Sequence, residues 1–417
     1  MKVNFSERDQ KRVSIFLTVL LIIDFMNFMI VELFGIGGMI INLGILGLVL
    51  LMQYKTVVKI NIPPIVLVSI ITVSIYYVVT RQLSSSTLFG RNFLYYFCVA
   101  SLLGMYKCDT ERFLKYLSLM TLLILPFYNS IFIEMNSTKY NTGIAMGLSY
   151  AMFPMLLGSL FHFVFYRDKA KVWQYGIYII AAFLLINLIL KGTRGILLSV
   201  VVAIALIFLK GGAKSGTNGV KVAIVAICSV LIAVFFYDIL EWLKDFLDAF
   251  GIDAYFLEKI ALLQERGDIT NGRNEIYRFS FEEIMKSPFF GHGLSTIYVN
   301  SGFRIIYSHN FILQLMYDGG LLLTVPVLLI IGRAIYCAFT QEDKNESIFT
   351  LFFIVFCLPR SFVSGDIWQN GFFWLFVMHS LKFHSIKRKI KPIKNFRGNS
   401  DDVKDAEAEN KGAEVAV

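Results

Sequence analysis

The sequence predicts an all-α polytopic membrane protein with about twelve transmembrane helices and one large extracytoplasmic loop that contains amphipathic helices. Of the 417 residues, 56% are hydrophobic, 15% are aromatic and only 17% are charged, and the mean hydropathy is +0.65. A chain of this composition could not fold in water without exposing large apolar patches. Apolar runs of roughly 17 to 25 residues, the length that a helix needs to cross the hydrocarbon core, recur along almost the whole chain.

The apolar runs place spans one to nine in residues 1–237 and spans ten to twelve in residues 311–381, with a loop of residues 238–310 between them. They are Ser14–Phe34, Gly37–Met52, Pro64–Thr80, Asn92–Met105, Phe113–Ile133, Ala145–Tyr166, Trp173–Leu190, Ile196–Leu209, Val220–Tyr237, Phe311–Phe339, Ile348–Phe362 and Ile367–Leu381. The first run contains Asp24 and no small-residue cleavage site follows it, so we expect it to remain as an anchor. In the eleventh run a proline follows only about ten apolar residues, which predicts a broken or re-entrant helix that presents Arg360 to a cavity.

The long loop has local order of its own. Residues 238–250 carry apolar side chains at helical spacing and charged side chains on the other face. This pattern is typical of an amphipathic helix that lies flat on the bilayer, and a lid packed on the helix bundle would show it too. A second helix is predicted over Arg273–Lys286, with Pro288 beyond its end. Gly291 and Gly293 follow in a turn, where both residues can adopt positive φ.

Lysines and arginines set the topology. Those in the short loops all fall on one side if the number of spans is even, and the positive-inside rule makes this side the cytoplasm. Both termini are then cytoplasmic, the long loop is periplasmic or extracellular, and the protein lies in the inner (cytoplasmic) membrane. Residues 382–417, basic at first and acidic after Ser400, are predicted to be a disordered cytoplasmic tail. The net charge of +9 follows from this rule, and no nucleic-acid-binding motif is present.

The sequence carries no signal for a metal or a cofactor. The five cysteines lie in or beside apolar spans, without metal-ligand spacing. The outward loops contain no DxD pair, and the chain contains no HExxH motif, P-loop or dinucleotide fingerprint. We therefore expect any phosphate charge to be met by cationic side chains.

Positive charge on the outward side is carried more by arginine than by lysine. Arginine keeps its proton and grips phosphate oxygens through a planar fork, so this bias indicates an anionic substrate. The candidate phosphate-binding residues are Arg91, Arg194, Arg273, Arg278 and Arg360. Arg273 stands out because a cation in the first turn of a helix opposes the helix dipole unless an anion binds there. Arg278 could instead pair with Glu282, and the other three could extend toward the membrane interface.

His309 lies directly before the tenth span, where a lipid headgroup would arrive, and Asn310 can cap that helix. A histidine near its unperturbed pKa can accept a proton from a hydroxyl group or donate a hydrogen bond to phosphate. It could also serve only to anchor the helix end. Asp318 lies further into the same span and is followed by two glycines, which fits a break in the helix.

Several short motifs follow one another in the second half of the chain. They are Thr193-Arg194-Gly195, Gly272-Arg273, Pro288 with Gly291-His292-Gly293, and Ser308-His309-Asn310 with Asp318-Gly319-Gly320. In this order and loop placement they resemble the O-antigen ligase and polymerase superfamily of bacterial envelope glycosyltransferases, best over residues 191–360. The sequence departs from the family in having Thr193 where a serine often precedes the arginine, and Asp318 where a glutamate is frequent.

The resemblance implies that arginines bind a sugar linked to undecaprenyl pyrophosphate and that the histidine motif matters for transfer. On this interpretation the catalytic residues are His309 and Arg273, the pyrophosphate-binding residues are Arg194, Arg278, Arg360 and Arg91, and the supporting residues are Asn310 and Asp318. The implied partners are the polyprenyl-pyrophosphate-linked oligosaccharide and the lipid bilayer, with a chain-length regulator and a flippase as protein partners and no nucleic acid.

The implied reaction is inverting, metal-independent glycosyl transfer on the outer side of the cytoplasmic membrane. We prefer a polymerase of O-antigen or capsular repeat units, because such an enzyme needs no fixed surface for the lipid A core. A ligase that transfers the polymer to the lipid A core is the alternative with the same chemistry. A flippase or other transporter is the alternative of another class. It could use Asp24 and Asp318 within the spans, but the sequence shows no two-halved repeat.

Overall fold

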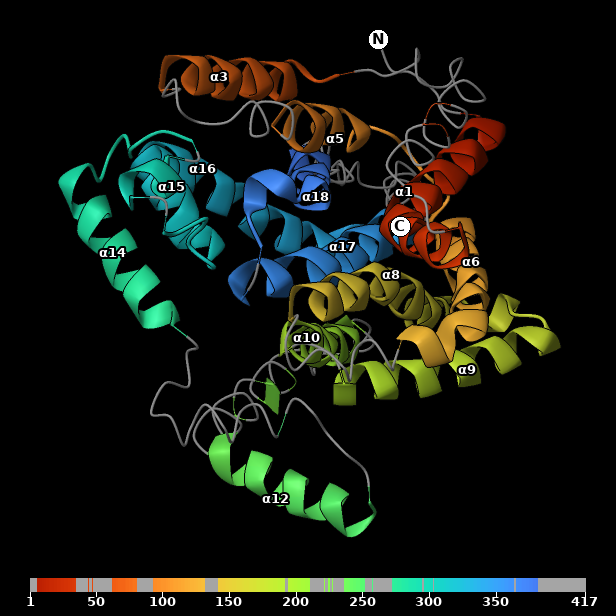
Figure 1. The fold of residues 1–417 in the computed structure, drawn as a ribbon. Helices are drawn as coiled ribbons and strands as arrows, with labels where there is room; N and C mark the ends of the chain where they lie inside the picture. Colours follow the sequence, from red (N-terminus) through yellow and green to blue (C-terminus); the bar gives the residue numbers. More distant parts are fainter. Residues whose placement is uncertain are drawn as a thin grey trace, which may run out of the picture. The chain divides into compact units, whose positions relative to one another are not determined.

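The computed structural model describes residues 6–34, 44, 47, 62–80, 93–131, 142–191, 194–210, 221, 224–225, 227, 236–251, 257, 272–294, 296–302, 304–363 and 365–381. Within these residues every regular element is helical (Figure 1). The all-α class that the sequence predicts is therefore confirmed for the described part of the chain.

Several helices are suited to a bilayer. Six are long and apolar enough to cross it. They are α1 (Glu7–Phe34), α6 (Thr110–Met120) with its continuation η2 (Thr121–Phe127) up to Ile131, α8 (Thr142–Tyr166), α9 (Val172–Lys191), α16 (Phe311–Thr340) and α17 (Lys344–Val363). Shorter helices are α3 (Pro64–Thr80), η1 (Phe93–Val99), α5 (Ala100–Leu103), α10 (Arg194–Lys210) and α18 (Gly371–Leu381). These helices make the chain a multi-pass membrane protein.

The predicted count of about twelve spans is not confirmed, since the described residues supply six helices of full spanning length. Two predicted spans, Gly37–Met52 and Val220–Tyr237, lie almost entirely outside the described residues, as does the predicted tail of residues 382–417. Where the remaining predicted spans can be compared, most of their boundaries agree with helices of the structure to within a few residues.

One end of the bundle is tied together by ion pairs and hydrogen bonds, and we call it the basic end. Arg112 in α6 pairs with Glu7 in α1, and Lys169 after α8 pairs with Glu111 in α6. Other contacts join further helix termini at this end: Tyr166 Oη donates to Asn345 Oδ1 at 2.7 Å, Lys210 Nζ to the carbonyl oxygen of Ala338 at 2.9 Å, and Lys107 Nζ lies 3.7 Å from Asp343. Among the described residues, Lys107, Lys169 and Lys210 therefore lie at one end, and which side of the membrane this end faces stays a prediction. The starts of α10, α16 and α18 and the end of α17 lie at the opposite end.

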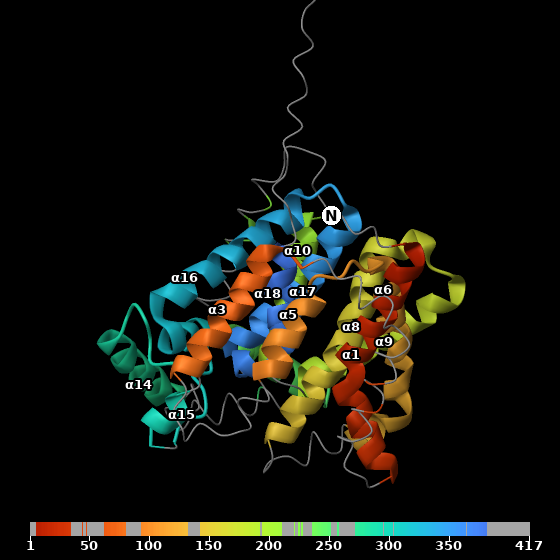
Figure 2. The same ribbon diagram turned by 90° about the horizontal axis from the view of Figure 1, so that it is seen from above.

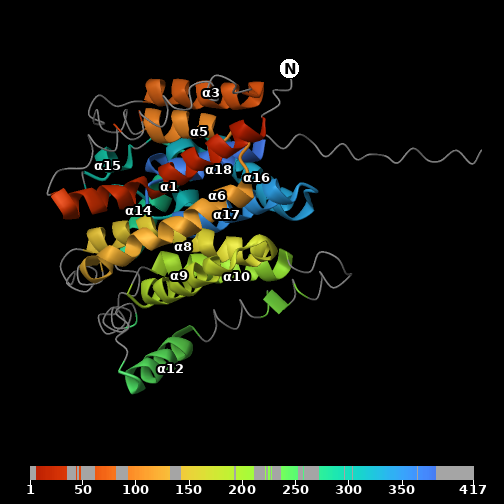
Figure 3. The ribbon, with the colours of Figure 1, turned by 90° about the vertical axis from the view of Figure 1, so that its right-hand side faces the viewer.

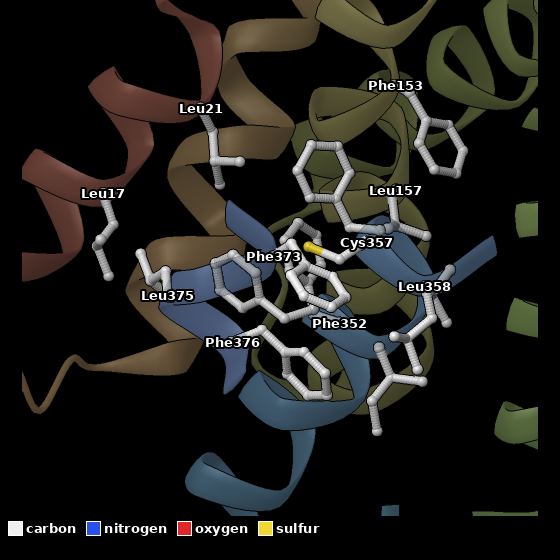
Figure 4. Packing of buried hydrophobic residues seen from close by; sticks show 14 of the residues in the cluster. Leu17, Leu21, Phe153, Leu157, Phe352, Cys357, Leu358, Phe373, Leu375 and Phe376 are labelled. Atoms are coloured by element: carbon white, nitrogen blue, oxygen red, sulfur yellow. The ribbon is translucent and has the colours of Figure 1, made fainter. Parts of the chain in front are cut away.

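Aromatic packing around α17 forms the core. This helix is buried along nearly its whole length and lies among α8, α10, α16 and α18 (Figure 1). Side chains of α1, α8 and α18 gather with those of α17 in one buried cluster. Figure 4 shows Leu17 and Leu21 of α1, Phe153 and Leu157 of α8, Phe352 and Cys357 of α17, and Phe373 and Phe376 of α18. Within a membrane such helices are held by close van der Waals packing rather than by expulsion of water.

The predicted break near Arg360 is wrong, because α17 continues through Pro359 to Val363. A proline removes one helical hydrogen bond and crowds the preceding turn. Neighbouring helices pack α17 on all sides here, from Leu351 to Leu358, and this packing holds the helix through the proline. Arg360 is thus presented by the last turn of a continuous helix.

The predicted break in α16 is confirmed, and the long loop fills it. Gly320 has φ 58° and ψ −157°, which is not helical. The turn after α14 (Arg273–Lys286) supplies the main-chain partners: the amides of His292 and Gly293 donate to the carbonyls of Tyr317 and Asp318 at 2.8 and 2.9 Å. In return, the amides of the residues after the break donate to this turn, Leu321 to Pro288 at 2.8 Å and Leu322 to Phe289 at 3.2 Å. Two helical hydrogen bonds are thus replaced by four bonds to the loop.

The glycines of this loop are used as predicted. Gly291 has φ 69° and Gly293 has φ 100°. From α3, the hydroxyl of Tyr76 lies 2.7 Å from the carbonyl oxygen of Phe290 and 2.6 Å from that of Asp318, and it shares its one proton between them. Figure 2 shows α14 and α15 (Ile297–Asn300) beside the start of α16. Part of the loop is therefore fixed against the helix bundle.

The first loop helix is α12 (Phe236–Ala249). It has features of a lid packed on the helix bundle and of an amphipathic helix that lies flat on the bilayer. Leu243 and Leu247 pack with Leu190 at the end of α9 and Leu197 near the start of α10. Figure 3 shows α9 and α10 next to α8. On the other side of α12 the rings of Trp242 and Phe246 stack with centroids 5.6 Å apart and remain exposed. Such an exposed aromatic face is suited to the membrane interface.

Candidate functional site

The first turn of α16 positions His309. Asn310 caps this helix, and its side-chain oxygen accepts hydrogen bonds from the amides of Ile312 and Leu313 at 3.0 and 3.3 Å, as predicted. His309 has φ 54°, and among the described residues no other non-glycine residue has a positive φ. Backbone conformations of this kind concentrate at functional sites because the surrounding structure must hold them in place.

The imidazole of His309 is held in its neutral form. The Nδ1 atom is buried and has no hydrogen-bond partner within the described part of the chain, and the ring lies 4.1 Å from that of Tyr307, centroid to centroid. Burial, assisted by the positive charge of Arg273, lowers the pKa of His309 from 6.5 to about 4. The expectation of a histidine near its unperturbed pKa is therefore wrong for the protein without substrate.

Arg273 is the first residue of α14, as predicted, and its charge reaches His309. The helix is held against the segment before α16 by Ser280, whose hydroxyl lies 3.4 Å from that of Ser308, and by Ile284, which packs on Ile297 and Tyr317. The structure thus brings together Arg273 and His309, which are separated by 36 positions in the sequence. The charge of Arg273 at the start of α14 therefore lies within electrostatic reach of His309.

The start of α16 is joined to the end of α17. The rings of Phe311 and Phe362 meet edge to face with centroids 4.7 Å apart. Beyond α17, Asp366 accepts a hydrogen bond from the side-chain amide of Gln314, and the backbone amide of Ile367 donates to Gln314 Oε1 at 3.2 Å. Burial raises the pKa of Asp366, against the effect of the hydrogen bonds that it accepts. His309 and Arg360 therefore belong to neighbouring helix ends.

Arg360 lies against Tyr150 of α8. The guanidinium carbon is 4.2 Å from the centre of the Tyr150 ring, a close cation–π contact. The charge of Arg360 also acts on Asp24 of α1. The partner that a membrane arginine needs is present, so Arg360 is held at this end of the bundle.

The structure describes the other three arginines that were predicted to bind pyrophosphate to different extents. Arg278 is 78% exposed, and its Nε lies 3.8 Å from Glu282, the surface pair that was its alternative. For Arg194 the structure describes the backbone, at the first position of α10. Arg91 lies outside the described residues. The pyrophosphate-binding role of these three residues stays a prediction.

Asp318 is a buried hub next to the break in α16. Its carboxylate accepts a hydrogen bond from the indole of Trp368 at 2.6 Å, and its carbonyl accepts from Gly293 and Tyr76. Asp318 thus links the loop turn, α3 and the segment before α18. These contacts are structural, and the supporting role of Asp318 in the reaction stays a prediction.

Several residues at this end were missed in the sequence. They are Tyr76, Tyr150, Gln314, Asp366 and Trp368. All lie in or beside apolar runs, where tyrosine, tryptophan and glutamine do not stand out from ordinary core residues. Asp366 alone carried a signal, as an acidic residue between two apolar runs. In the part of the chain that the structure describes, no group of three or more His, Cys, Asp or Glu side chains is placed to hold a metal ion.

Residues 179–328 match the family model described as O-antigen ligase (Wzy_C). The match covers less than half of the chain, and it includes Arg194, Arg273, His309 and the break in α16. Residues 179–328 are therefore similar to the O-antigen ligase family, as the motifs in this part of the chain predicted. The match gives no support to the flippase alternative. No curated protein matches the chain.

Proposed function

We propose that this chain, whose residues 179–328 match the O-antigen ligase family, transfers a glycan from a polyprenyl pyrophosphate to the hydroxyl group of an acceptor sugar. We further propose that it is a polymerase of O-antigen or capsular repeat units that acts on the outer side of the cytoplasmic membrane. Members of this family are membrane glycosyltransferase-like enzymes whose substrates are lipid-linked saccharides. The polymerase and the ligase share the reaction and differ in the acceptor.

The observation that carries this proposal is the pairing of Arg273 with a neutral His309 at the start of α16. A pyrophosphate leaving group gathers negative charge as its bond to the anomeric carbon breaks. Cationic donors already in place stabilise this charge more than they stabilise the bound substrate, which is the requirement for catalysis. The energy comes from the activated donor itself.

The transfer step involves one bond formed and one broken. The acceptor oxygen forms a bond with the anomeric carbon from the face opposite the pyrophosphate, and the bond from that carbon to the pyrophosphate oxygen breaks. The electron pair stays with the pyrophosphate, next to Arg273. The proton of the acceptor hydroxyl goes to His309, and the configuration at the carbon is inverted.

The depressed pKa of His309 links its basicity to donor binding. A base with a pKa of about 4 is weak at neutral pH. A bound pyrophosphate would neutralise the charge of Arg273 and add negative charge beside the imidazole, and both changes raise the pKa of His309. His309 would then become an effective base only when the donor is in place.

A deletion strain tests the proposal through its surface polysaccharide and its lipid-linked intermediates. For a polymerase, we expect the polysaccharide ladder to disappear while single repeat units are still transferred to their acceptor. Long chains that remain on the carrier lipid would instead identify a ligase, which the description of the matching family keeps as the second candidate. Single units trapped on the inner leaflet would contradict glycosyl transfer altogether.

A further inference from the structure

The hydroxyl group of Tyr150 is buried without a hydrogen-bond partner among the described residues. Tyr150 is only 6% exposed and lies in α8, two turns from its start. Other tyrosine hydroxyls of the bundle are paired: that of Tyr166 with Asn345, that of Tyr178 with His162, and that of Tyr128 with Asn187. A buried hydroxyl that forms no hydrogen bond destabilises the fold, and this one is free to donate to a bound group.

The first turn of α10 approaches this hydroxyl closely. A Cβ atom on Gly195 would lie 2.1 Å from Tyr150 Oη and 3.1 Å from Val363 at the end of α17, so any larger residue would push the hydroxyl away. The first amides of a helix have no intrahelical partner, and the helix dipole makes this end positive. The carbonyl of Gly195 is occupied, because Ser199 Oγ donates to it at 2.9 Å.

Arg360 adds a full positive charge to the same place. Its guanidinium lies over the Tyr150 ring at 4.2 Å, so the hydroxyl, the guanidinium and the first turn of α10 are neighbours. All three provide hydrogen-bond donors. Donors that converge beside a helix start are the usual elements of a phosphate site, and the unpaired hydroxyl is the element not used by the protein itself.

We propose that the hydroxyl of Tyr150, the guanidinium of Arg360 and the first turn of α10 bind a phosphate of the lipid-linked pyrophosphate, with Tyr150 as a hydrogen-bond donor to it. This inference rests on the proposed function, since it assigns a subsite to the same donor.

The test measures binding rather than transfer. The full-length protein in lipid nanodiscs is titrated with undecaprenyl pyrophosphate and, separately, with inorganic pyrophosphate. Tyr150→Phe removes only the hydroxyl and keeps the ring under Arg360, and we expect it to raise the Kd for undecaprenyl pyrophosphate about tenfold, as for loss of one hydrogen bond to a charged group. Tyr166→Phe, on the same helix but at the basic end, should leave this Kd unchanged.

Thermal stability without ligand provides a second readout. Because the Tyr150 hydroxyl has no partner in the described residues, Tyr150→Phe should melt at the same temperature as the wild type or higher. Tyr166→Phe loses its bond to Asn345 and should melt at a lower temperature. A binding loss in a protein of undiminished stability cannot be attributed to misfolding.

The outcomes separate the subsite from the proposed function. An unchanged Kd in Tyr150→Phe would overturn the subsite, even if the wild type transfers glycans. If the Kd of Tyr150→Phe rises tenfold but the wild type transfers no glycan, the subsite is kept and the proposed function is overturned. If inorganic pyrophosphate shows the same loss, the site binds any pyrophosphate; if it fails to bind, the lipid chain is needed. Both of these last results support the subsite.

Discussion

Gly291, in the turn after α14, and Gly320, at the break of α16, lie backbone against backbone. A Cβ atom on Gly291 would lie 2.6 Å from the main chain of Asp318 and Gly319, and one on Gly320 would lie 2.4 Å from the main chain of Phe289. Both residues have positive φ, 69° and 58°. Neither position can accept a side chain without moving the loop away from the helix.

We therefore expect Gly291→Ala to destabilise the protein strongly and to reduce activity. The alanine methyl would meet backbone atoms, which cannot move aside as a flexible side chain can, and positive φ adds roughly 1–2 kcal/mol. Gly302→Ala is the matched control, because Gly302 has φ 64° but open space around its Cβ position. Thermal unfolding of the two variants measures the steric part alone. Equal melting temperatures would show that the backbone contact does not contribute.

Loss of the Trp368 indole should lower the free energy of unfolding more than loss of the nearby Trp374 indole. Trp368 donates to the buried carboxylate of Asp318, a bond to a charged group worth about 1.5–3 kcal/mol. Trp374 donates to the neutral carbonyl of Ile367, a bond worth about 0.5–1.5 kcal/mol. Trp368→Phe should therefore unfold more readily than Trp374→Phe in mixed micelles of increasing denaturing detergent. The reverse order would show that the Trp368 bond to Asp318 is not the stronger of the two.

Arg273→Ala and His309→Ala should abolish polysaccharide synthesis at normal protein levels, and a single preorganised donor is worth about 10²–10³ in rate. Arg273→Lys should restore little, because the ammonium lacks the planar fork of the guanidinium. Lys286→Ala is the control, since this lysine at the other end of α14 is exposed, pairs with Glu283 and has no predicted role in the site. The measurement is the glycan ladder together with immunoblots of the membrane fraction. Full activity in either alanine variant of the pair would remove that residue from the site.

The pH profile should report on His309. With a pKa of about 4, the imidazole stays neutral across the physiological range, so kcat/KM should be flat down to about pH 5 and fall toward pH 4. The inflection in kcat should lie at higher pH, because bound pyrophosphate raises the pKa of His309. Arg273→Gln removes a nearby cation and should raise the pKa of His309, which NMR titration of the imidazole measures without any need for activity. The same imidazole pKa in the variant and the wild type would show that Arg273 does not act on His309.

The same shift has a consequence for stability. The folded pKa of His309 lies below the value of 6.5 expected for the unfolded chain, so the folded state favours the neutral form. The stabilisation from this residue is fully present above pH 6.5 and is lost as the pH falls toward 4. A His309→Gln variant, which cannot titrate, should lose less stability than the wild type between pH 6.5 and 4. An equal loss in both proteins would place the acid sensitivity elsewhere.

The sequence predicted where the helices lie better than it predicted which residues pack against one another. Helix positions follow from apolar runs, and α14 was predicted at its observed bounds with a proline two residues beyond its end. The break at Gly320 could be predicted from two adjacent glycines, whereas continuity through Pro359 could not, because it depends on packing from four other helices. The pKa of His309 and the unpaired hydroxyl of Tyr150 depend on burial by residues distant in sequence, which no local pattern encodes.

The exchange of main-chain hydrogen bonds between residues 288–293 and 317–322 also bears on how the protein is made. In hydrocarbon, peptide groups without partners cost several kcal/mol each, so α16 cannot open at Gly320 before the turn after α14 is available to pair with it. We expect α16 to enter the bilayer as an unbroken rod during synthesis and to open only when that turn docks. Maturation of the enzyme would then end with the step that gives the start of α16, and with it His309, its final shape.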